Sequence, residues 1–335
     1  MQATETRTGV ATREMFYNEA LNDALRGEMR RDDRVLVIGE DIAEHGGAFQ
    51  VTAGLLDEFG PTRVRQTPIS EIGIVGAGVG AALTGLRPVV ELMYVDFAGL
   101  AMDQIVNQAA QNRFMFGGQA RVPLVVRTQG GSGRGNAAQH SKSLEAWFTH
   151  VPGLKVVMPA TPADAKGLLT ASIRDDDPVM FIEHKLLYRT KGQVPEGEHL
   201  VPLGVADVKR RGKDLTIVSW SREVLFALEA ATKLAADGVD AEVIDLRTLV
   251  PLDKDAVLSS VRRTHRLLVL HEAVKRGGYG AEIAATIAEE AFDDLDAPPR
   301  RLAGLETPIP YAQHLEKSVV PQVEDIVRVA KEMLS

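Results

Sequence analysis

The sequence predicts an α/β protein with two domains, each built on a parallel sheet that helices cover on both faces. Short apolar runs that suit buried strands alternate along the chain with longer segments whose apolar residues recur at helical spacing. The 335 residues exceed the usual size of one domain, and 45% of them are hydrophobic, enough for two sizeable cores. A stretch rich in Gly, Pro and charge interrupts the alternation. We expect a flexible tail over 1–12, a first domain over 13–188, a linker over 189–204 and a second domain over 205–335.

The first domain is expected to begin with an amphipathic helix between Phe16 and Met29, where apolar residues recur at helical spacing. Short apolar runs mark its strands. These strands cover 35–39, 87–97, 122–128, 154–160 and 178–184. Further helices are expected at 71–86, around 105–116 and at 162–174. Because helices connect the strands, the sheet should be parallel and buried on both faces.

The second domain repeats the alternation of strands and helices. Its expected strands cover 215–221, 241–247 and 266–273. Its helices are expected to begin near Glu223, Lys254 and Gly278, and a terminal amphipathic helix is expected near 321–334.

A glycine-rich stretch, TPISEIGIVGAGVGAALTGLRP, spans 67–88 and has two readings. From Gly76 it matches the G-x-G-x-x-A dinucleotide fingerprint, which requires a buried strand directly before it. The preceding residues are too polar for such a strand, and Pro68 lacks a backbone donor. We favour a helix that begins after Ser70 as N-cap, with Glu71 in the first turn and the glycines serving close packing. From spacing alone, Glu71 is either a helix-capping acid or a functional carboxylate.

A second candidate site is His140, which lies in the loop GGSGRGNAAQHSKS over 130–143. Long loops of small residues in compact domains are often functional. Arg134 and Lys142 add positive charge that would suit an anionic partner. The alternative is a surface histidine on a flexible loop.

Composition excludes several classes of function. A net charge of −8 argues against nucleic-acid binding. There is no run of 18 apolar residues and no signal peptide, so we expect a cytoplasmic protein without a membrane partner. The absence of cysteine rules out thiol nucleophiles and thiolate metal sites. No H-E-x-x-H or G-x-S-x-G motif indicates a metalloprotease or a serine hydrolase.

A series of longer motifs identifies a family. The chain carries, in this order, TPISEIG, ELMYVDFAGLAMDQIVNQAA, FMFGGQ, AAQHSKSLEAWFTHVPGLKVV, TPADAKGLL, IRDDDPV, EHKLLY, EVIDLRTLVPLD and LEKSVVPQ. Over about 13–334 it resembles the β subunits of the thiamine diphosphate-dependent decarboxylating component of 2-oxo acid dehydrogenase complexes. Within that family, ELMYVDFAG, FIEHKLLY and RTKGQVPEG are most similar to acetoin dehydrogenases. The resemblance implies a transketolase-like pyrimidine-binding domain followed by a transketolase C-terminal-like domain.

The resemblance also implies a role for the glycine-rich stretch. In this family the glutamate of TPISE, here Glu71, pairs with the aminopyrimidine nitrogen of thiamine diphosphate and exchanges a proton with it. Ile69, Met93 and Phe97 match positions that line the pyrimidine pocket, and their ordinary alternative is a place in the core.

An absent motif implies a partner subunit. The family holds the diphosphate through Mg²⁺ with a G-D-G motif, and this sequence has none. An α subunit should therefore supply that half of the site, in a heterotetramer of two α and two β chains. His140 matches the histidine that faces lipoamide, which is carried on an acyltransferase core.

Relatives also bind potassium through backbone carbonyls, and these positions are expected at Leu124, Ser172, Ile173, Asp175 and Asp177. The alternative for Asp175 and Asp177 is a pair of solvated acids on a turn. Two positions depart from the family pattern, where Gln66 replaces an expected Asp and Lys142 an expected Gln.

The function that these expectations imply is cleavage of acetoin with transfer of the two-carbon unit to lipoamide. The alternative within the family is decarboxylation of pyruvate or a branched-chain 2-oxo acid. An alternative from another class is a nucleotide-binding α/β regulator without catalysis, which requires the dinucleotide fingerprint to be real.

Overall fold

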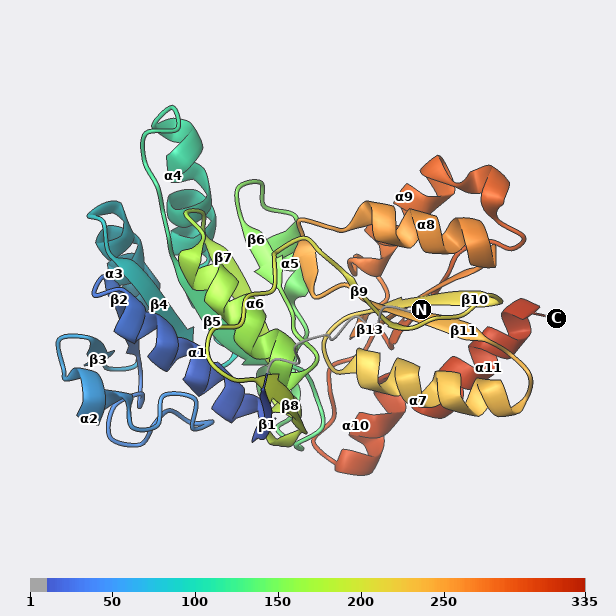
Figure 1. Ribbon diagram of the computed structural model, residues 1–335, viewed down its shortest axis with the longest axis horizontal. Helices are drawn as coiled ribbons and strands as arrows, with labels where there is room; N and C mark the ends of the chain where they lie inside the picture. The colour runs from blue at the N-terminus through green and yellow to red at the C-terminus, as the bar shows by residue number, and fades with distance from the viewer. Residues whose placement is uncertain (1–10, 335) are drawn as a thin grey trace, which may run out of the picture.

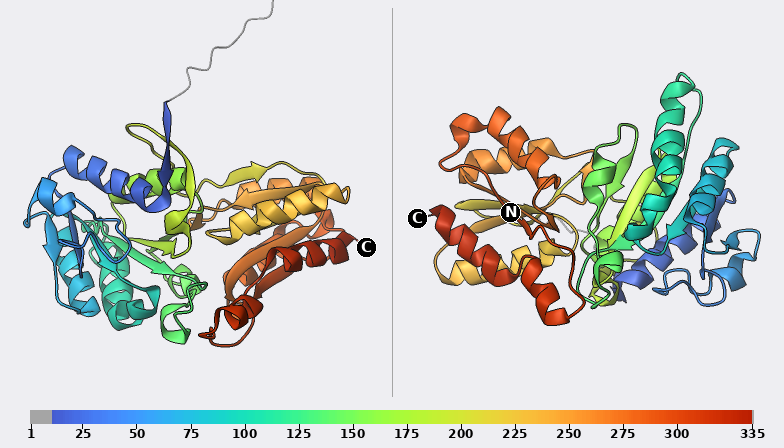
Figure 2. Two further views of the ribbon diagram at one scale, coloured as in Figure 1. Left: turned by 90° about the horizontal axis from the view of Figure 1, so that it is seen from below. Right: turned by 180° about the vertical axis from the view of Figure 1, so that it is seen from behind.

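The computed structural model describes residues 11–334, which form two α/β domains lying side by side (Figure 1). The first domain contains a seven-stranded sheet in the order β12-β6-β7-β5-β4-β2-β3. The second contains a five-stranded sheet in the order β14-β13-β10-β11-β9. A two-stranded ribbon, β1-β8, stands apart from both sheets (Figure 2).

The strands of the chain have the following bounds: β1 Thr12–Phe16, β2 Val35–Gly39, β3 Val64–Gln66, β4 Arg87–Leu92, β5 Val125–Gly130, β6 Lys155–Val157, β7 Val179–His184, β8 Lys191–Pro195, β9 Asp207–Arg210, β10 Leu215–Ser219, β11 Ala241–Asp245, β12 Thr248–Val250, β13 Leu267–Val274 and β14 Arg300–Gly304. The α-helices are α1 Tyr17–Arg31, α2 Leu55–Phe59, α3 Glu71–Leu83, α4 Ala110–Met115, α5 Glu145–Thr149, α6 Pro162–Arg174, α7 Glu223–Ala236, α8 Lys254–Thr264, α9 Gly280–Glu290, α10 Gln313–Val319 and α11 Val323–Leu334. A 3₁₀ helix η1, Val95–Ala101, and a π-helix η2, Asp103–Ala109, precede α4. Short 3₁₀ turns are η3 Ala138–His140, η4 Leu187–Arg189 and η5 Phe292–Asp294.

The central strands of the first domain are apolar on both faces because helices cover both faces. Along β2, Val35 and Val37 belong to the core beneath α1 and α6, whereas Leu36 and Ile38 belong to the core beneath α3. All strand pairs of this sheet are parallel except β12 with β6. The predicted parallel, doubly covered sheet is therefore confirmed.

The second domain has the same layered build. In its sheet, β10, β11, β13 and β14 pair in parallel, and β9 joins the edge in the antiparallel direction. Helices α7 and α11 pack on one face, and α8 and α9 on the other (Figure 1). The core under α8 and α9 continues without a break into the core under α3, so apolar packing joins the two domains. No helix within residues 11–334 combines the length and hydropathy needed to cross a lipid bilayer.

Several segments differ from the sequence expectations. The expected strand 87–97 ends at Leu92 as β4, and from Val95 the chain forms the 3₁₀ helix η1. Part of the expected tail and part of the expected linker pair with each other, because Thr12 in β1 lies opposite Pro195 in β8; residues 1–10 lie outside the described part. The polar residues before the glycine-rich stretch form β3, an edge strand in which only Val64 is buried. Strand β12 leaves the second domain and pairs with β6 of the first.

The glycine-rich stretch forms α3, and its geometry excludes the dinucleotide fingerprint. The motif needs its glycines at the opening of a helix, whereas Gly76 lies five residues after Glu71, the first residue of α3. Ser70 stands at the N-cap position, but its side chain makes no capping hydrogen bond. A Cβ at Gly78 would lie 2.6 Å from Val90 Cγ1, so this glycine brings α3 close to β4. The packing role is therefore confirmed at Gly78.

We predict that Gly78→Ala lowers the free energy of unfolding by about 1–3 kcal/mol, because the new methyl overpacks the contact with β4. Gly80→Ala is the matched control in the same helix, since a Cβ there meets nothing within 4 Å. It should raise stability by about 0.5–1 kcal/mol through helix propensity. Urea unfolding of the purified chain measures both, and equal effects would contradict the packing role.

Candidate active site

The centre of the candidate site is Glu71, at the N-terminus of α3. Its residue is 8% exposed. Within residues 11–334, no group forms a hydrogen bond or an ion pair with its carboxylate. Neither carboxylate oxygen is fully buried, so both remain accessible. The geometry therefore leaves the carboxylate open to a partner from a bound group.

Two other carboxylates lie near Glu71, at the carboxyl ends of β2 and β4. Glu40 directly follows β2, and its Oε2 is buried without a hydrogen-bond partner. Burial raises the pKa of the Glu40 carboxyl group, and the neighbouring Glu71 and Glu91 raise it further. Glu91, on β4, is instead ion-paired with Arg127 at 2.6 Å. The surroundings of Glu71 thus favour a group that donates hydrogen bonds or carries positive charge.

A buried ion network supports this edge of the sheet. Arg127, on β5, binds Glu183 of β7 in a bidentate pair at 2.7 and 2.8 Å. The Tyr188 hydroxyl also donates to Glu183, at 2.7 Å. The sequence analysis missed Glu40, Arg127 and Glu183 as parts of the site. The signal was present for Arg127 and Glu183, because charged residues inside apolar strands of a doubly covered sheet must be paired.

Aromatic rings bring His140 to the same edge. The His140 ring lies edge-on to Tyr94 and Phe97, with centroids 4.9 and 5.4 Å away. The Tyr94 and Phe97 rings also meet edge-to-face, at 5.6 Å. Lys185 Nζ donates a hydrogen bond to the His140 carbonyl. The half-buried His140 is therefore an ordered part of a wall and not a free surface histidine.

The other predicted pocket residues differ in exposure. Phe97 and Met93 are half-buried, and Gln129 donates to the Met93 carbonyl at 3.1 Å. Ile69 is 79% exposed, and Ile72 in the first turn of α3 is 50% exposed. Leu100 is 62% exposed and lies on η1, which packs against α3. Exposed apolar side chains on adjoining elements suit a surface that another molecule covers. Lys142 was expected to offer positive charge to an anionic partner, but its ammonium group is already paired with Asp96 at 3.0 Å.

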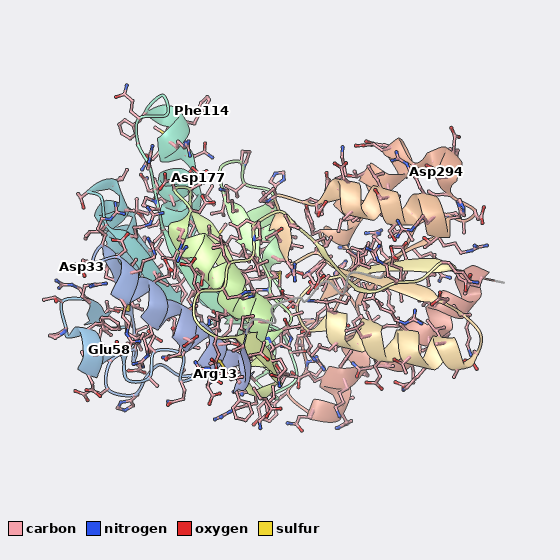
Figure 3. The ribbon with its side chains drawn as sticks, in the orientation of Figure 1. Arg13, Asp33, Glu58, Phe114, Asp177 and Asp294 are labelled. Carbon is pink, nitrogen blue, oxygen red and sulfur yellow. The ribbon has the colours of Figure 1, made fainter. Side chains whose placement is uncertain are left out.

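The residues expected around potassium meet between the start of β5 and the end of α6. The carbonyls of Ile173 and Asp175 accept hydrogen bonds from the Arg87 guanidinium at 2.8 and 2.6 Å. The Asp175 and Asp177 carboxylates pair with Lys155, and Arg113 also pairs with Asp177. Figure 3 labels Asp177 in the first domain, below Phe114.

The two remaining residues of that set are also engaged. The Leu124 carbonyl accepts from Val179 N–H at 2.9 Å, and the Ser172 hydroxyl donates to the Leu168 carbonyl. No cluster of three or more His, Asp or Glu within residues 11–334 could hold a metal ion. The Arg87 guanidinium occupies the Ile173 and Asp175 carbonyls, and a backbone N–H occupies that of Leu124. Potassium stays a prediction.

Comparisons with known proteins match both domains. A family model described as the pyrimidine-binding domain of transketolase matches residues 13–191, and the transketolase C-terminal domain matches 204–326. A solved structure titled split gene transketolase, inactive beta4 tetramer, superposes with a TM-score of 0.79 over 97% of this chain and 99% of that chain. Its sequence identity of 21% supports the fold alone.

Three relatives are similar over nearly the whole chain. Acetoin:2,6-dichlorophenolindophenol oxidoreductase subunit beta of Bacillus subtilis is 48% identical, covering 96% of this chain and 98% of its own. Pyruvate dehydrogenase E1 component subunit beta-1 of Oryza sativa is 48% identical, covering 96% and 87%. 2-Oxoisovalerate dehydrogenase subunit beta of Bacillus subtilis is 46% identical, covering 95% and 98%. Identity therefore does not discriminate between the three substrates.

Proposed function

We propose that this chain is the β subunit of an acetoin dehydrogenase. The chain belongs to the transketolase-like family of 2-oxo acid dehydrogenase E1 β subunits. The family depends on thiamine diphosphate and, in its complexes, uses lipoamide as acceptor. When bound, the cofactor supplies a nucleophilic carbon and an electron sink for cleavage beside a carbonyl.

The observation that carries the catalytic part of the proposal is the partnerless carboxylate of Glu71. A carboxylate at this position accepts a hydrogen bond from the aminopyrimidine nitrogen and moves a proton to and from it. Met93 and Phe97 supply an apolar wall for the ring, and Ile69 covers it once a partner surface is in place. Exclusion of water around Glu71 strengthens this contact.

An α subunit completes the site in this proposal. The exposed apolar side chains of Ile69 and Ile72 flank Glu71 in the sequence, Leu100 lies on the adjoining η1, and such side chains suit a protein partner. The α subunit would hold the diphosphate and its Mg²⁺, in an assembly of two α and two β chains. That assembly would work in the cytoplasm and deliver the acyl unit to the lipoyl groups of an acyltransferase core.

His140 serves the second half of the proposed reaction. Opening of the lipoyl disulfide requires a proton for one sulfur, and an imidazole ring can donate one. The Tyr94 and Phe97 rings fix the plane of the His140 ring. The choice of acetoin as substrate is based on the motifs ELMYVDFAG, FIEHKLLY and RTKGQVPEG. Pyruvate and branched-chain 2-oxo acids are the alternatives.

The substrate is tested by co-purifying the chain with its α subunit and measuring reduction of an artificial electron acceptor. We expect kcat/KM for acetoin to exceed that for pyruvate and 3-methyl-2-oxobutanoate by at least about tenfold. The isolated β chain should show no turnover. Preference for a 2-oxo acid would overturn the acetoin assignment, and turnover by β alone would overturn the two-subunit site.

We predict that Glu71→Gln lowers the rate of cofactor-dependent turnover by about 10²–10⁴-fold, because the amide keeps the shape but cannot exchange the proton. Assembly with α should survive, and size-exclusion chromatography checks it. Glu58→Gln, a surface carboxylate paired with Arg30 in the same domain, is the control and should keep normal turnover. Near-normal turnover of Glu71→Gln would show that Glu71 has no catalytic role and acts only as an acidic residue in the first turn of α3.

His140→Ala separates the two halves of the reaction. We expect it to keep most activity with the artificial acceptor and to lose about 10²-fold or more with the lipoyl acyltransferase. Both rates are measured on the same assembled enzyme, so a folding defect would lower both together. Equal losses would assign His140 to the earlier steps, and no loss in either assay would leave it without a catalytic role.

A further inference from the structure

The loop that carries His140 is fastened to the second domain by two buried carboxylates, Glu316 and Glu272. We propose that Glu316 is a positioning residue that sets the place of His140 at the active site, with Glu272 as a second anchor. The proposal rests on the function proposed for His140 and adds the device that holds it.

Glu316 lies on α10, which sits beside the loop region of the first domain (Figure 2). Its Oε1 accepts a hydrogen bond from Gly133 N–H at 2.5 Å, and its Oε2 accepts one from Gly135 N–H at 3.0 Å. The residue is 1% exposed. Within the described part of the chain, no cationic side chain forms an ion pair with Glu316. A buried carboxylate needs such bonds, so the loop backbone is what makes this burial tolerable.

The loop backbone is shaped to receive the carboxylate. Gly133 and Gly135 have φ of +108° and +67°, which L side chains rarely adopt. A Cβ at Gly133 would lie 2.3 Å from Leu186 Cδ1, and one at Gly135 would lie 3.1 Å from the Tyr311 carbonyl oxygen. Backbone N–H groups turned inward in this way form an anion-binding concavity.

Glu272, on β13, binds Ser132, the residue directly before Gly133. Its Oε1 accepts from Ser132 N–H at 2.5 Å, and its Oε2 lies 2.9 Å from His184 Nε2. Burial would raise the pKa of the Glu272 carboxyl group, but His184, Arg222 and the Ser132 N–H outweigh it and lower that pKa to about 2. Glu272 therefore stays ionised and anchored near neutral pH.

Lys185 contacts the loop on both sides of Ala137. Its N–H donates to the Gly130 carbonyl at the start of the loop, at 3.2 Å, and its Nζ donates to the His140 carbonyl after Ala137. Between the two ends, Ala137 has a φ of +57°, which a residue with a Cβ keeps only where its surroundings impose it. Anchors on both sides of Ala137 impose that conformation, so release of the Glu316 end would let the turn at Ala138–His140 relax.

Glu316 is the cleaner of the two anchors to test. Glu272 also pairs with His184 and Arg222, so its replacement would disturb other contacts. The carboxylate oxygens of Glu316 bond only to the loop. In Glu316→Gln the amide oxygen can accept a hydrogen bond from one loop N–H. The amide NH₂ cannot accept one from the other N–H, so one of the two hydrogen bonds is lost.

The experiment is hydrogen–deuterium exchange on the α–β complex with thiamine diphosphate, for Glu316→Gln and for Glu324→Gln as control. Glu324 lies in the same domain, with a side chain 78% exposed and paired with Lys233. We expect exchange over 130–143 to accelerate about tenfold in Glu316→Gln and to stay unchanged in the control. The ratio of the lipoyl-dependent rate to the artificial-acceptor rate should fall about tenfold through kcat, with KM for the lipoyl domain unchanged.

The outcomes separate this inference from the proposed function. Unchanged exchange in Glu316→Gln overturns the anchor. Faster exchange with an unchanged rate ratio overturns positioning of His140, provided that His140→Ala lowers the ratio. If His140→Ala also leaves the ratio unchanged, the proposed role of His140 fails and the anchor of the loop stands. If Glu316→Gln does not fold, Glu316→Asp is the second variant. It keeps the negative charge on a side chain that is one methylene shorter, so exchange over 130–143 should be faster than in the wild type, but by less than tenfold.

Discussion

The buried contact of Arg127 with Glu91 and Glu183 is the interaction on which the candidate site depends. It spans three adjacent strands, since Glu91 on β4 lies directly opposite Arg127 on β5, and Glu183 is on β7. Removing one partner from such a buried group leaves an uncompensated charge, which typically costs about 3–5 kcal/mol. The contact therefore holds the register of β4, β5 and β7, the strands whose carboxyl ends border the candidate site.

The two domains act as one support for the site. Their apolar core is continuous, β12 completes the sheet of the first domain, and Glu316 and Glu272 hold the His140 loop. Buried polar contacts also cross this seam, where Trp220 Nε1 donates to Glu145 at 3.3 Å. Burial nevertheless raises the pKa of the Glu145 carboxyl group to about 7. The geometry of the first domain is thus set partly by the second.

Glycine serves two physical purposes in this chain. In α3, Gly78 removes a side chain so that a helix and a strand can approach closely. In the His140 loop, Gly133 and Gly135 supply positive φ values that turn N–H groups toward a carboxylate. A sequence shows both as glycine-rich stretches, and only the backbone angles and contacts distinguish them.

The sequence by itself determined the order of the elements and supplied the candidate site residues. The helix Pro162–Arg174 has the predicted ends, and α7, α8 and the central strands begin within three residues of expectation, because periodicity and turn residues are local signals. Glu71 was identified because a carboxylate after TPIS carries the family resemblance. Helix α3 ends at Leu83, short of Leu86, since Thr84 and Gly85 close it.

Only the tertiary structure decided the pairings between distant segments. The β1–β8 ribbon, the return of β12 to the first sheet and the pairing of Lys142 with Asp96 all join residues far apart in sequence. The same holds for the contacts of Arg87 with the carbonyls expected around potassium, and for Glu316 with the His140 loop. Hydropathy and spacing describe each segment's own preference, whereas a buried charge finds its partner only after folding has brought the two segments together.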